Sequence, residues 1–387
     1  MKKQLWQNKP TAFKILFVAF VSVAGFLLSA FSLPKTDFTL TIYAGDSVYV
    51  LGYPDIFPSF GELKLNDIDG VVDRIFLDNV IPPVDAEVLF TPDAENIFTY
   101  KAEKYGRAPD REKLKKDITL ALNERYPFVT AESVTLKPDF TLEKAYASTK
   151  ERGHFCTFYG TSSRERKKNI ELAADKINGL ILENGEVFSF NERVGDRTKE
   201  NGYLDAKIIK DGKFIDGVGG GVCQVSTTFY NAALLSAVEV TERHAHSVAV
   251  GYVSPSFDAA VSYGWYDLKL KNTSGGRLYV KSEADGNNLT FTIFGIENEY
   301  EIKRVSEVYK KESPGYEIVE DFSGSLCGDL TEKVLISPKY EITSIGKLLY
   351  KSKKDKNKKF FVTLGTDKYR GIKGVIAKRV RRAEVNN

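Results

Sequence analysis

Cysteine is scarce in this sequence, with Cys156, Cys223 and Cys327 as the only three among 387 residues. So few cysteines exclude a disulfide-dense scaffold, and an odd number leaves at least one thiol free. One alternative is a Cys156–Cys327 disulfide, which would leave Cys223 as the reactive thiol. The other is three unpaired structural thiols.

An excess of charge is also missing. The sequence has 55 Lys and Arg residues against 52 Asp and Glu residues, which gives a net charge of +3. A chain so close to neutrality does not favour a strongly polyanionic partner. We therefore expect no nucleic acid among its partners.

Histidine is as scarce as cysteine, and two of the three histidines, His244 and His246, follow Cys223 in the same part of the chain. Cys223 comes after the glycines Gly219–Gly221 and begins an apolar stretch that predicts a helix. A helix N-terminus stabilises a thiolate, and a histidine can hold or accept its proton. The pattern therefore predicts a nucleophilic cysteine, with a buried and inert helix cysteine as the alternative.

His246 and His244 are both candidates for the catalytic base. Alternating residues predict a strand from His244 to Val253, which would place the two histidines on one face. We favour His246 because it lies further into that strand, and either Asp258 or Asp267 could fix its tautomer. Zinc bound by the cysteine and both histidines is a weaker alternative, because the CxxC and HExxH spacings are absent. We expect no metal and no other cofactor.

The glycines before the cysteine give the backbone unusual freedom. Glycine adopts positive φ angles and lets a substrate approach the main chain closely. The amides of Gly220, Gly221 and Gln224 are therefore candidates for binding the oxyanion of a tetrahedral intermediate. A tight strand-to-helix turn is the structural alternative, and both interpretations can be true together.

The N-terminus contains an uncharged apolar run, residues 15–33, which follows several lysines. Its length is close to the ~20 residues that a helix needs to cross a bilayer. The lysines predict that residues 1–14 are cytoplasmic and that the remainder is extracytoplasmic, in a single-pass protein anchored in the cell membrane by this N-terminal helix. The alternative is a cleaved signal peptide with a site at Leu28-Ser29-Ala30, which would give a secreted protein.

Residues 36–150 predict a small α+β unit. Residues 38–51 alternate around a glycine turn and indicate a hairpin, and residues 86–101 indicate further strands. Pro109 and Asp110 open a helix with one apolar face.

Residues 154–296 predict a second α+β domain. Ser162 and Glu165 form a capping box before one helix, and the helix of Cys223 would lie against a mostly antiparallel sheet. Strands are predicted at the end of the domain, over residues 266–271, 278–282 and 289–294. Residues 297–387 form a β-rich, basic C-terminal segment, so the fold class predicted for the whole chain is α+β.

A series of short motifs spans the second domain in a fixed order, at residues 157–159, 166–170, 177–179, 185–191, 194–198, 202–206, 219–231, 242–247, 258–264 and 267–272. Together they resemble a VanW domain over residues 154–296. Residues 90–93 and 105–110 are similar to the putative peptidoglycan-binding domain that often precedes VanW domains. The alternative for that first unit is a spacer.

The resemblance implies a function at the cell wall. Some VanW proteins are implicated as cysteine L,D-transpeptidases that form 3-3 cross-links between peptidoglycan stem peptides. Cys223 would then form a thioester, with His246 or His244 as the base. Two alternatives stay open: a cysteine carboxypeptidase or endopeptidase that uses the same residues with water, and a non-catalytic peptidoglycan-binding or scaffold protein of the envelope.

Two arginines and a tyrosine are candidates for holding the carboxylates of a stem peptide. Arg243, Arg197 and Tyr263 fall within the motifs, and the planar fork of arginine matches a carboxylate. Surface ion pairs are the alternative interpretation of these residues.

Overall fold

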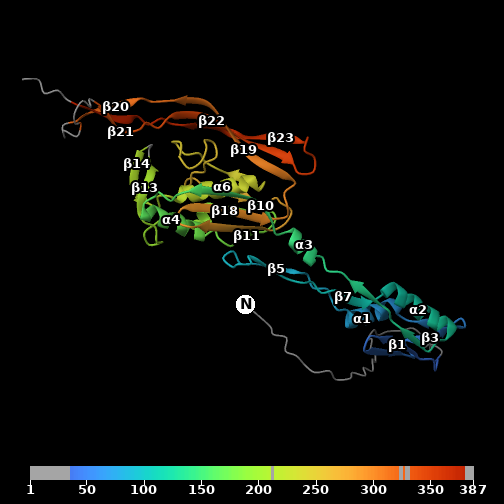
Figure 1. Ribbon diagram of the computed structural model, residues 1–387. Helices are drawn as coiled ribbons and strands as arrows, with labels where there is room; N and C mark the ends of the chain where they lie inside the picture. The colour runs from blue at the N-terminus through green and yellow to red at the C-terminus, as the bar shows by residue number, and fades with distance from the viewer. Residues whose placement is uncertain (1–34, 211–212, 322–325, 327–331, 380–387) are drawn as a thin grey trace, which may run out of the picture. The chain divides into compact units, whose positions relative to one another are not determined.

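The computed structural model describes residues 35–210, 213–321, 326 and 332–379 (Figure 1). The predicted cytoplasmic segment and anchor, residues 1–14 and 15–33, lie outside the described residues. Within the described part of the chain, no helix is long and apolar enough to cross a membrane. The chain divides into two compact units, one running to Glu87 and resuming over Lys101–Leu142, the other comprising Val88–Tyr100 and the chain from Glu143 onward.

The prediction of an α+β fold class is wrong for the described chain. The structure is β-rich, with 43% strand and 19% helix. The physical reason is that the chain after Gly295 consists of long alternating strands, and each unit adds several short strand pairs.

The first unit packs two helices against short strands, and the predicted hairpin and helix are both confirmed. Its strands are β1 (Leu40–Ala44), β2 (Ser47–Leu51), β3 (Ile56–Ser59), β4 (Glu62–Leu65), β7 (Gly106–Pro109), β8 (Phe128–Thr130) and β9 (Ser133–Leu136). The helices are α1 (Ile68–Asn79) and α2 (Arg111–Glu124). The carboxylate of Asp110 caps α2 by accepting the amide of Lys113 at 3.0 Å, and Leu114 and Ile118 are buried on its apolar face.

The second unit contains a four-stranded antiparallel sheet in the order β10-β18-β17-β11. These strands are β10 (Lys150–Phe158), β18 (Asn288–Gly295), β17 (Leu278–Ala284) and β11 (Leu180–Leu182). The two predicted strands at 278–282 and 289–294 are therefore confirmed. The pair β5 (Glu87–Phe90) and β6 (Phe98–Lys101) brings Phe90 and Phe98 edge-on to Tyr279 of this sheet.

Helix α6 (Val222–Leu235) lies at the centre of this unit and packs against β10 and β18. Nearly every residue of α6 is buried, including polar side chains such as Gln224 and Asn231, so the helix lies within the core of this unit. Phe229 is fully buried, and its ring lies 5.3 Å from that of Phe188 and 5.0 Å from that of Phe291. This packing fixes the position of the helix that carries Cys223.

The other elements surround α6 and its sheet. They are α3 (Leu142–Ala147), α4 (Arg164–Asp175), α5 (Phe190–Val194), β12 (Val187–Ser189), β13 (Asp205–Lys210), β14 (Lys213–Val218), β15 (Glu239–Glu242) and β16 (Lys269–Lys271). The cap of α4 is Ser163, whose hydroxyl accepts the amide of Arg166 at 3.3 Å, so the cap predicted at Ser162 is wrong by one residue.

The C-terminal part forms two three-stranded sheets. One has the order β19-β22-β23 and is antiparallel throughout, with β19 (Tyr300–Glu312), β22 (Glu341–Ser352) and β23 (Lys359–Tyr369). The other has the order β20-β24-β21, with β20 (Tyr316–Asp321), β24 (Gly374–Arg379) and β21 (Glu332–Ile336). The first sheet lies beside α6 (Figure 1), and its residues Ile302 and Leu348 belong to the same buried cluster as Phe229.

The predicted strand from His244 to Val253 is wrong. Strand β15 ends at Glu242, and the following segment is a loop whose only ladder contact is an isolated bridge between His244 and Ala260. The polar groups of the loop bond instead to side chains and to backbone groups that are distant in sequence. For example, the amide of His246 donates to the carboxylate of Asp258 at 2.7 Å. Alternating residues in sequence therefore do not correspond to a strand here.

Candidate active site

A strained glycine turn sets the start of α6. Gly221 is the N-cap residue and has a φ of 111°, in the region that favours glycine. A Cβ at this position would lie 2.9 Å from Cγ1 of Ile170 and 3.0 Å from Cγ of Arg166. Cys223 follows as the second residue of the helix, where backbone amides have no intrahelical partner and a negative charge is stabilised.

The thiol of Cys223 is partly exposed, and its Sγ donates to the carbonyl of Val261 at 3.4 Å. His246 lies near enough to Cys223 for its charge to act on the thiol. The other side of the imidazole is occupied, because Nδ1 of His246 lies 2.6 Å from Oδ2 of Asp258. Nε2 is therefore the nitrogen left for the cysteine. The side chains of Cys223, His246 and Asp258 form a chain of contacts of the kind that activates a nucleophile.

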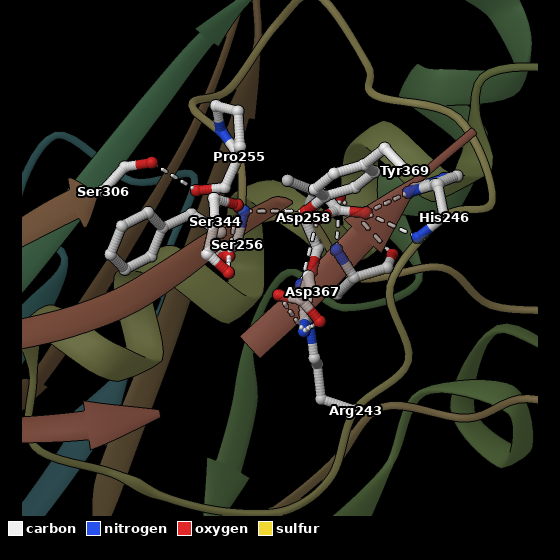
Figure 2. A network of polar contacts seen from close by, with 12 residues as sticks. Arg243, His246, Pro255, Ser256, Asp258, Ser306, Ser344, Asp367 and Tyr369 are labelled. Atoms are coloured by element: carbon white, nitrogen blue, oxygen red, sulfur yellow. Dashed lines mark hydrogen bonds and ion pairs between the residues drawn. The ribbon is translucent and has the colours of Figure 1, made fainter. Parts of the chain in front are cut away.

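Asp258 is the most heavily bonded carboxylate of the site (Figure 2). Its side chain is 1% exposed. Besides His246, it accepts Nη2 of Arg243 at 2.9 Å and the hydroxyl of Tyr369 at 2.6 Å. Nη1 of Arg243 in turn lies 2.8 Å from both carboxylate oxygens of Asp367. These bonds fix the orientation of the acid that holds the histidine.

The charges of the site favour a thiolate beside an imidazolium. Burial raises the pKa of the Cys223 thiol, but the hydrogen bond and charge of His246 outweigh it and lower that pKa below its ordinary value. Burial lowers the pKa of His246, but its hydrogen bonds to Asp258 and Cys223 raise the pKa to about 10. For Asp258, burial raises the pKa while His246 and Arg243 lower it to about 2. The cysteine is thereby prepared for nucleophilic attack near neutral pH.

The other two predicted candidates lie elsewhere. Nε2 of His244 is 3.1 Å from Oε1 of Glu242, and the side chain is 37% exposed. Asp267 accepts the hydroxyl of Ser189 at 2.5 Å and the backbone amide of Asn191 at 2.9 Å. Thus the structure joins His246 with Asp258 and gives His244 and Asp267 separate partners. In the described chain no group of His, Cys, Asp and Glu side chains is arranged to hold a metal ion.

Gln224 serves the packing of α6. Its backbone amide donates to the carbonyl of Gly221 at 2.9 Å. Its side chain is buried, accepting Nη2 of Arg166 at 2.8 Å and donating to Oγ1 of Thr157 at 3.0 Å. The carbonyl of Gly220 accepts the side-chain amide of Asn169 at 3.0 Å. These bonds hold the glycine turn on α4 and occupy the backbone amide of Gln224, one of the predicted oxyanion donors.

The predicted carboxylate-binding residues fall into two groups. Arg243 is 16% exposed and fully engaged with two carboxylates, so it orients the site from within. Arg197 contributes positive charge at Cys223, and its guanidinium lies 6.0 Å from the ring of Tyr263. Nη1 of Arg197 is buried, and no described residue accepts a hydrogen bond from it. Tyr263 is 51% exposed.

Three residues of the site escaped prediction from sequence. Arg166 lies on α4, and Asp367 and Tyr369 lie on β23, which is separated from Arg243 and Asp258 by 124 and 111 positions respectively. Arg166 belongs to the motif at residues 166–170, but nothing in that motif indicates its bond to Gln224. No local motif marks Asp367 and Tyr369, because they contact the site only after the sheet has packed on the loop. Cys156 is exposed, and its pairing with Cys327 stays a prediction because Cys327 lies outside the described residues.

Comparison with known proteins matches the middle of the chain. The family described as VanW like protein matches residues 165–294. The chain is 36% identical over 150 residues to the uncharacterized protein YoaR of Bacillus subtilis (strain 168), a match that covers 39% of this chain and 50% of the relative. It is 30% identical over 156 residues to the vancomycin B-type resistance protein VanW of Enterococcus faecalis (strain ATCC 700802 / V583), with 38% and 56% covered. The chain therefore spans about half the length of the curated relatives it matches. No solved structure matches it.

Proposed function

Because the chain is a VanW family protein by virtue of residues 165–294, we propose that it is a cell-wall enzyme that transfers acyl groups between peptidoglycan stem peptides. Family membership supports a role related to the cell wall. One observation carries the chemistry: the imidazole of His246 lies between Cys223 and the buried carboxylate of Asp258 and lowers the pKa of the thiol. Such a site suits an L,D-transpeptidase, which would act outside the cytoplasmic membrane.

In the first half-reaction the thiolate of Cys223 attacks the carbonyl carbon of the third residue of a tetrapeptide stem. A C–S bond forms, and the carbonyl oxygen takes the negative charge of the tetrahedral intermediate. The imidazolium of His246 then gives its proton to the departing amine, the C–N bond breaks, and terminal D-alanine leaves. A thioester on Cys223 remains.

In the second half-reaction the side-chain amine of a neighbouring stem attacks the thioester carbonyl. Neutral His246 takes the proton of this amine, the C–S bond breaks, and the thiolate is restored beside an imidazolium. Asp258 keeps the imidazole in one tautomer and stabilises its charged form throughout. The new amide is the 3-3 cross-link.

The oxyanion would be stabilised by the start of α6. The amide of Cys223 lies in the first helical turn, where it has no intrahelical carbonyl partner. A donor of this kind acts on charge that develops in the transition state, and removal of one such donor typically costs on the order of 100-fold in rate.

Substrate recognition would use Arg197 and the aromatic turn beside it. The terminal carboxylate of the stem would supply the acceptor that Nη1 of Arg197 lacks among the described residues. Tyr263 and Trp265 follow closely on Val261, whose carbonyl contacts Cys223, and Trp265 is 83% exposed. Exposed aromatic side chains beside a reactive thiol are suited to binding a ligand.

The test is to incubate the purified protein with a disaccharide-tetrapeptide and to follow both products and adducts by mass spectrometry. We expect cross-linked dimer, free D-alanine and a thioester on the peptide containing Cys223. Cys223→Ala and Cys223→Ser abolish all three, whereas Cys156→Ala, which removes the exposed thiol, leaves them unchanged. Accumulation of tripeptide without dimer would assign a carboxypeptidase instead. Binding to peptidoglycan with no adduct and no product would overturn the enzymatic proposal.

A further inference from the structure

The sheet β19-β22-β23 lies beyond the residues that match the VanW family, yet its strand β23 contacts the site directly. We propose that this sheet positions the proposed catalytic histidine, with Asp367 and Tyr369 acting on His246 through Arg243 and Asp258. The proposal rests on the proposed function for its catalytic meaning. Its geometry stands on the contacts that follow.

One side chain of β23 binds Asp258 directly, and another binds Arg243, which in turn binds Asp258 (Figure 2). The hydroxyl of Tyr369, a residue that is 1% exposed, donates to Oδ1 of Asp258 at 2.6 Å. Both carboxylate oxygens of Asp367 accept from Nη1 of Arg243 at 2.8 Å. Nη2 of the same guanidinium donates to Asp258. Charges therefore alternate from Asp367 through Arg243 and Asp258 to His246.

The loop that carries His246 and Asp258 is also fastened to the sheet at several points (Figure 2). The amide of Arg370, just after β23, donates to the carbonyl of Ser247 at 2.7 Å. The hydroxyl of Ser306 on β19 donates to the carbonyl of Pro255 at 2.8 Å. The loop is thus bonded to the sheet on both sides of its turn, which removes the freedom that a surface loop would have.

Ser256 shows how closely the loop and the sheet fit. Its φ of 67° lies in the left-handed region, which costs a residue with a side chain on the order of 1 kcal/mol. Its amide donates to the hydroxyl of Tyr369 at 2.7 Å, and its hydroxyl lies 2.7 Å from that of Ser344 on β22. A Cβ at Gly346 would lie 2.9 Å from the carbonyl oxygen of Ser256, so β22 approaches the loop as closely as a glycine allows.

The sheet shares its core with α6, so it cannot act as a separate appendage. Ile302 of β19 and Leu348 of β22 belong to the buried cluster that contains α6. Arg304 of β19 donates to the side chain of Asn231 on α6 at 2.6 Å, and its guanidinium lies 4.1 Å from the ring centre of Phe155. The nucleophile on α6 and the base on the loop are therefore held against one common support.

The two residues of β23 should influence His246 in opposite directions. Asp367 neutralises Arg243, so its loss leaves a cation whose charge disfavours the imidazolium. Tyr369 donates to Asp258 and withdraws part of its negative charge, so its loss strengthens the attraction of Asp258 for the imidazolium. The other charged and titratable groups around His246 and its partners Arg243 and Asp258 are Cys223 and Tyr230 of α6, Tyr252 of the loop, and Arg304 of β19.

The experiment is an NMR titration of the His246 ring in the full chain, which is practical because the sequence has only three histidines. Asp367→Asn keeps the shape of the side chain and removes its charge. We expect it to lower the midpoint of the His246 titration by about one pH unit, a tenfold change in proton affinity. Tyr369→Phe is expected to raise the midpoint. Asp367→Glu keeps the charge and is expected to keep the midpoint of the wild type.

Matched controls lie on the same sheet. Glu341→Gln removes the same charge from β22, where the side chain is 50% exposed and pairs with Lys310. Tyr309→Phe removes a hydroxyl from β19 at a residue that is 62% exposed. Neither control should move the midpoint.

Two results would overturn the proposal. In the first, Asp367→Asn and Tyr369→Phe do not shift the midpoint of the His246 titration, just as the controls do not. In the other, both variants move it together toward the ordinary histidine value, as simple loosening of the loop would do. Because the titration needs no turnover, it stays informative if no transpeptidase activity is found. A shifted midpoint without activity would remove the proposed function and leave the positioning role.

Discussion

His246 and Asp258 form a buried ion pair, and the signs of their pKa shifts predict how the stability of the fold depends on pH. The pKa of His246 in the folded chain is about 10, above its ordinary 6.5. The stabilisation from its protonated form is therefore complete below about pH 6.5 and is lost as the pH rises through about 10. For Asp258 the folded pKa is about 2, below its ordinary 3.8, so its stabilisation is present above 3.8 and is lost as the pH falls through about 2.

Replacing His246 should therefore cost most stability at mildly acidic pH. His246→Gln removes one partner of a buried charge pair, which we expect to lower the free energy of unfolding by roughly 3 kcal/mol at pH 6. The difference from the wild type should shrink as the pH rises toward 10. Urea unfolding at pH 6, 8 and 10 measures it. His244→Gln, at the histidine paired with Glu242, is the control and should change stability by less than about 0.5 kcal/mol at every pH. A deficit in His246→Gln that grows with pH would contradict the assignment of the charge.

At this scale the sequence indicates the nucleophile but does not decide between the two candidate acids. Cys223 is marked by local features, namely the glycines before it and the helix that it begins. Asp258 and Asp267 look alike in sequence. In the structure Asp267 accepts hydrogen bonds from Ser189 and Asn191, whereas Asp258 binds His246. Only the folded chain distinguishes them.

At the scale of elements, the glycine turn before α6 has a strained backbone and also positions the candidate nucleophile Cys223. Gly221 needs a φ of 111° and has no space for a Cβ between Ile170 and Arg166. The turn sets the start of the helix that carries Cys223, so a shift of the turn changes both the stability of the fold and the environment of Cys223.

Gly221→Ala should accordingly affect two measurements at once. The left-handed backbone alone costs an alanine about 1 kcal/mol, and the clash with Ile170 and Arg166 adds to this cost. We therefore expect the free energy of unfolding to fall by about 3 kcal/mol. Alkylation of Cys223 by iodoacetamide at pH 7 should become at least tenfold slower as the first turn of the helix moves.

The matched control is Gly185→Ala. Gly185 has a φ of 86°, but a Cβ there would meet no atom within 4 Å. Gly185→Ala should lower the free energy of unfolding only by the cost of the left-handed backbone, about 1 kcal/mol. Cys223 should keep the wild-type rate of alkylation. Equal losses in the two variants, with equal alkylation rates, would show that the contacts of Gly221 do not matter.

Elements with local signals could be predicted from the sequence, and elements made by distant contacts could not. Helix α2 was predictable because Asp110 caps it and its apolar residues recur at helical spacing. The hairpin of β17 and β18 was predictable from its turn. The loop after Glu242 alternates like a strand, but its polar groups bond to β23 and to Asp258, so its true conformation depends on a sheet that comes much later in the chain.

At the scale of the whole molecule, two separate cores stabilise the two compact units. One contains Ile118 of α2 and the hairpin of β1 and β2. The other contains Phe229 of α6 and extends to Leu348 of β22, so the matched VanW region and the C-terminal sheet share a core. No described side chain belongs to both clusters. The fold class was mispredicted at this scale, because sequence reasoning treated the C-terminal strands as an appended segment.

Cavities in the two cores should therefore lower the stability of different units. Ile118→Ala is expected to cost about 3 kcal/mol and to lower only one of two calorimetric transitions, without changing the alkylation of Cys223. Leu348→Ala should cost a similar amount, lower the other transition and make Cys223 more accessible to alkylation at temperatures below unfolding. Ile118→Val, which removes a single methyl group, is the matched mild control at about 1 kcal/mol. If both alanine variants lowered one common transition, the cores would unfold together. The sheet shares its core with α6, so loosening the sheet should expose the nucleophile that α6 carries. If Leu348→Ala instead lowered the transition that Ile118→Ala lowers and left the alkylation of Cys223 unchanged, the C-terminal sheet would not support the site.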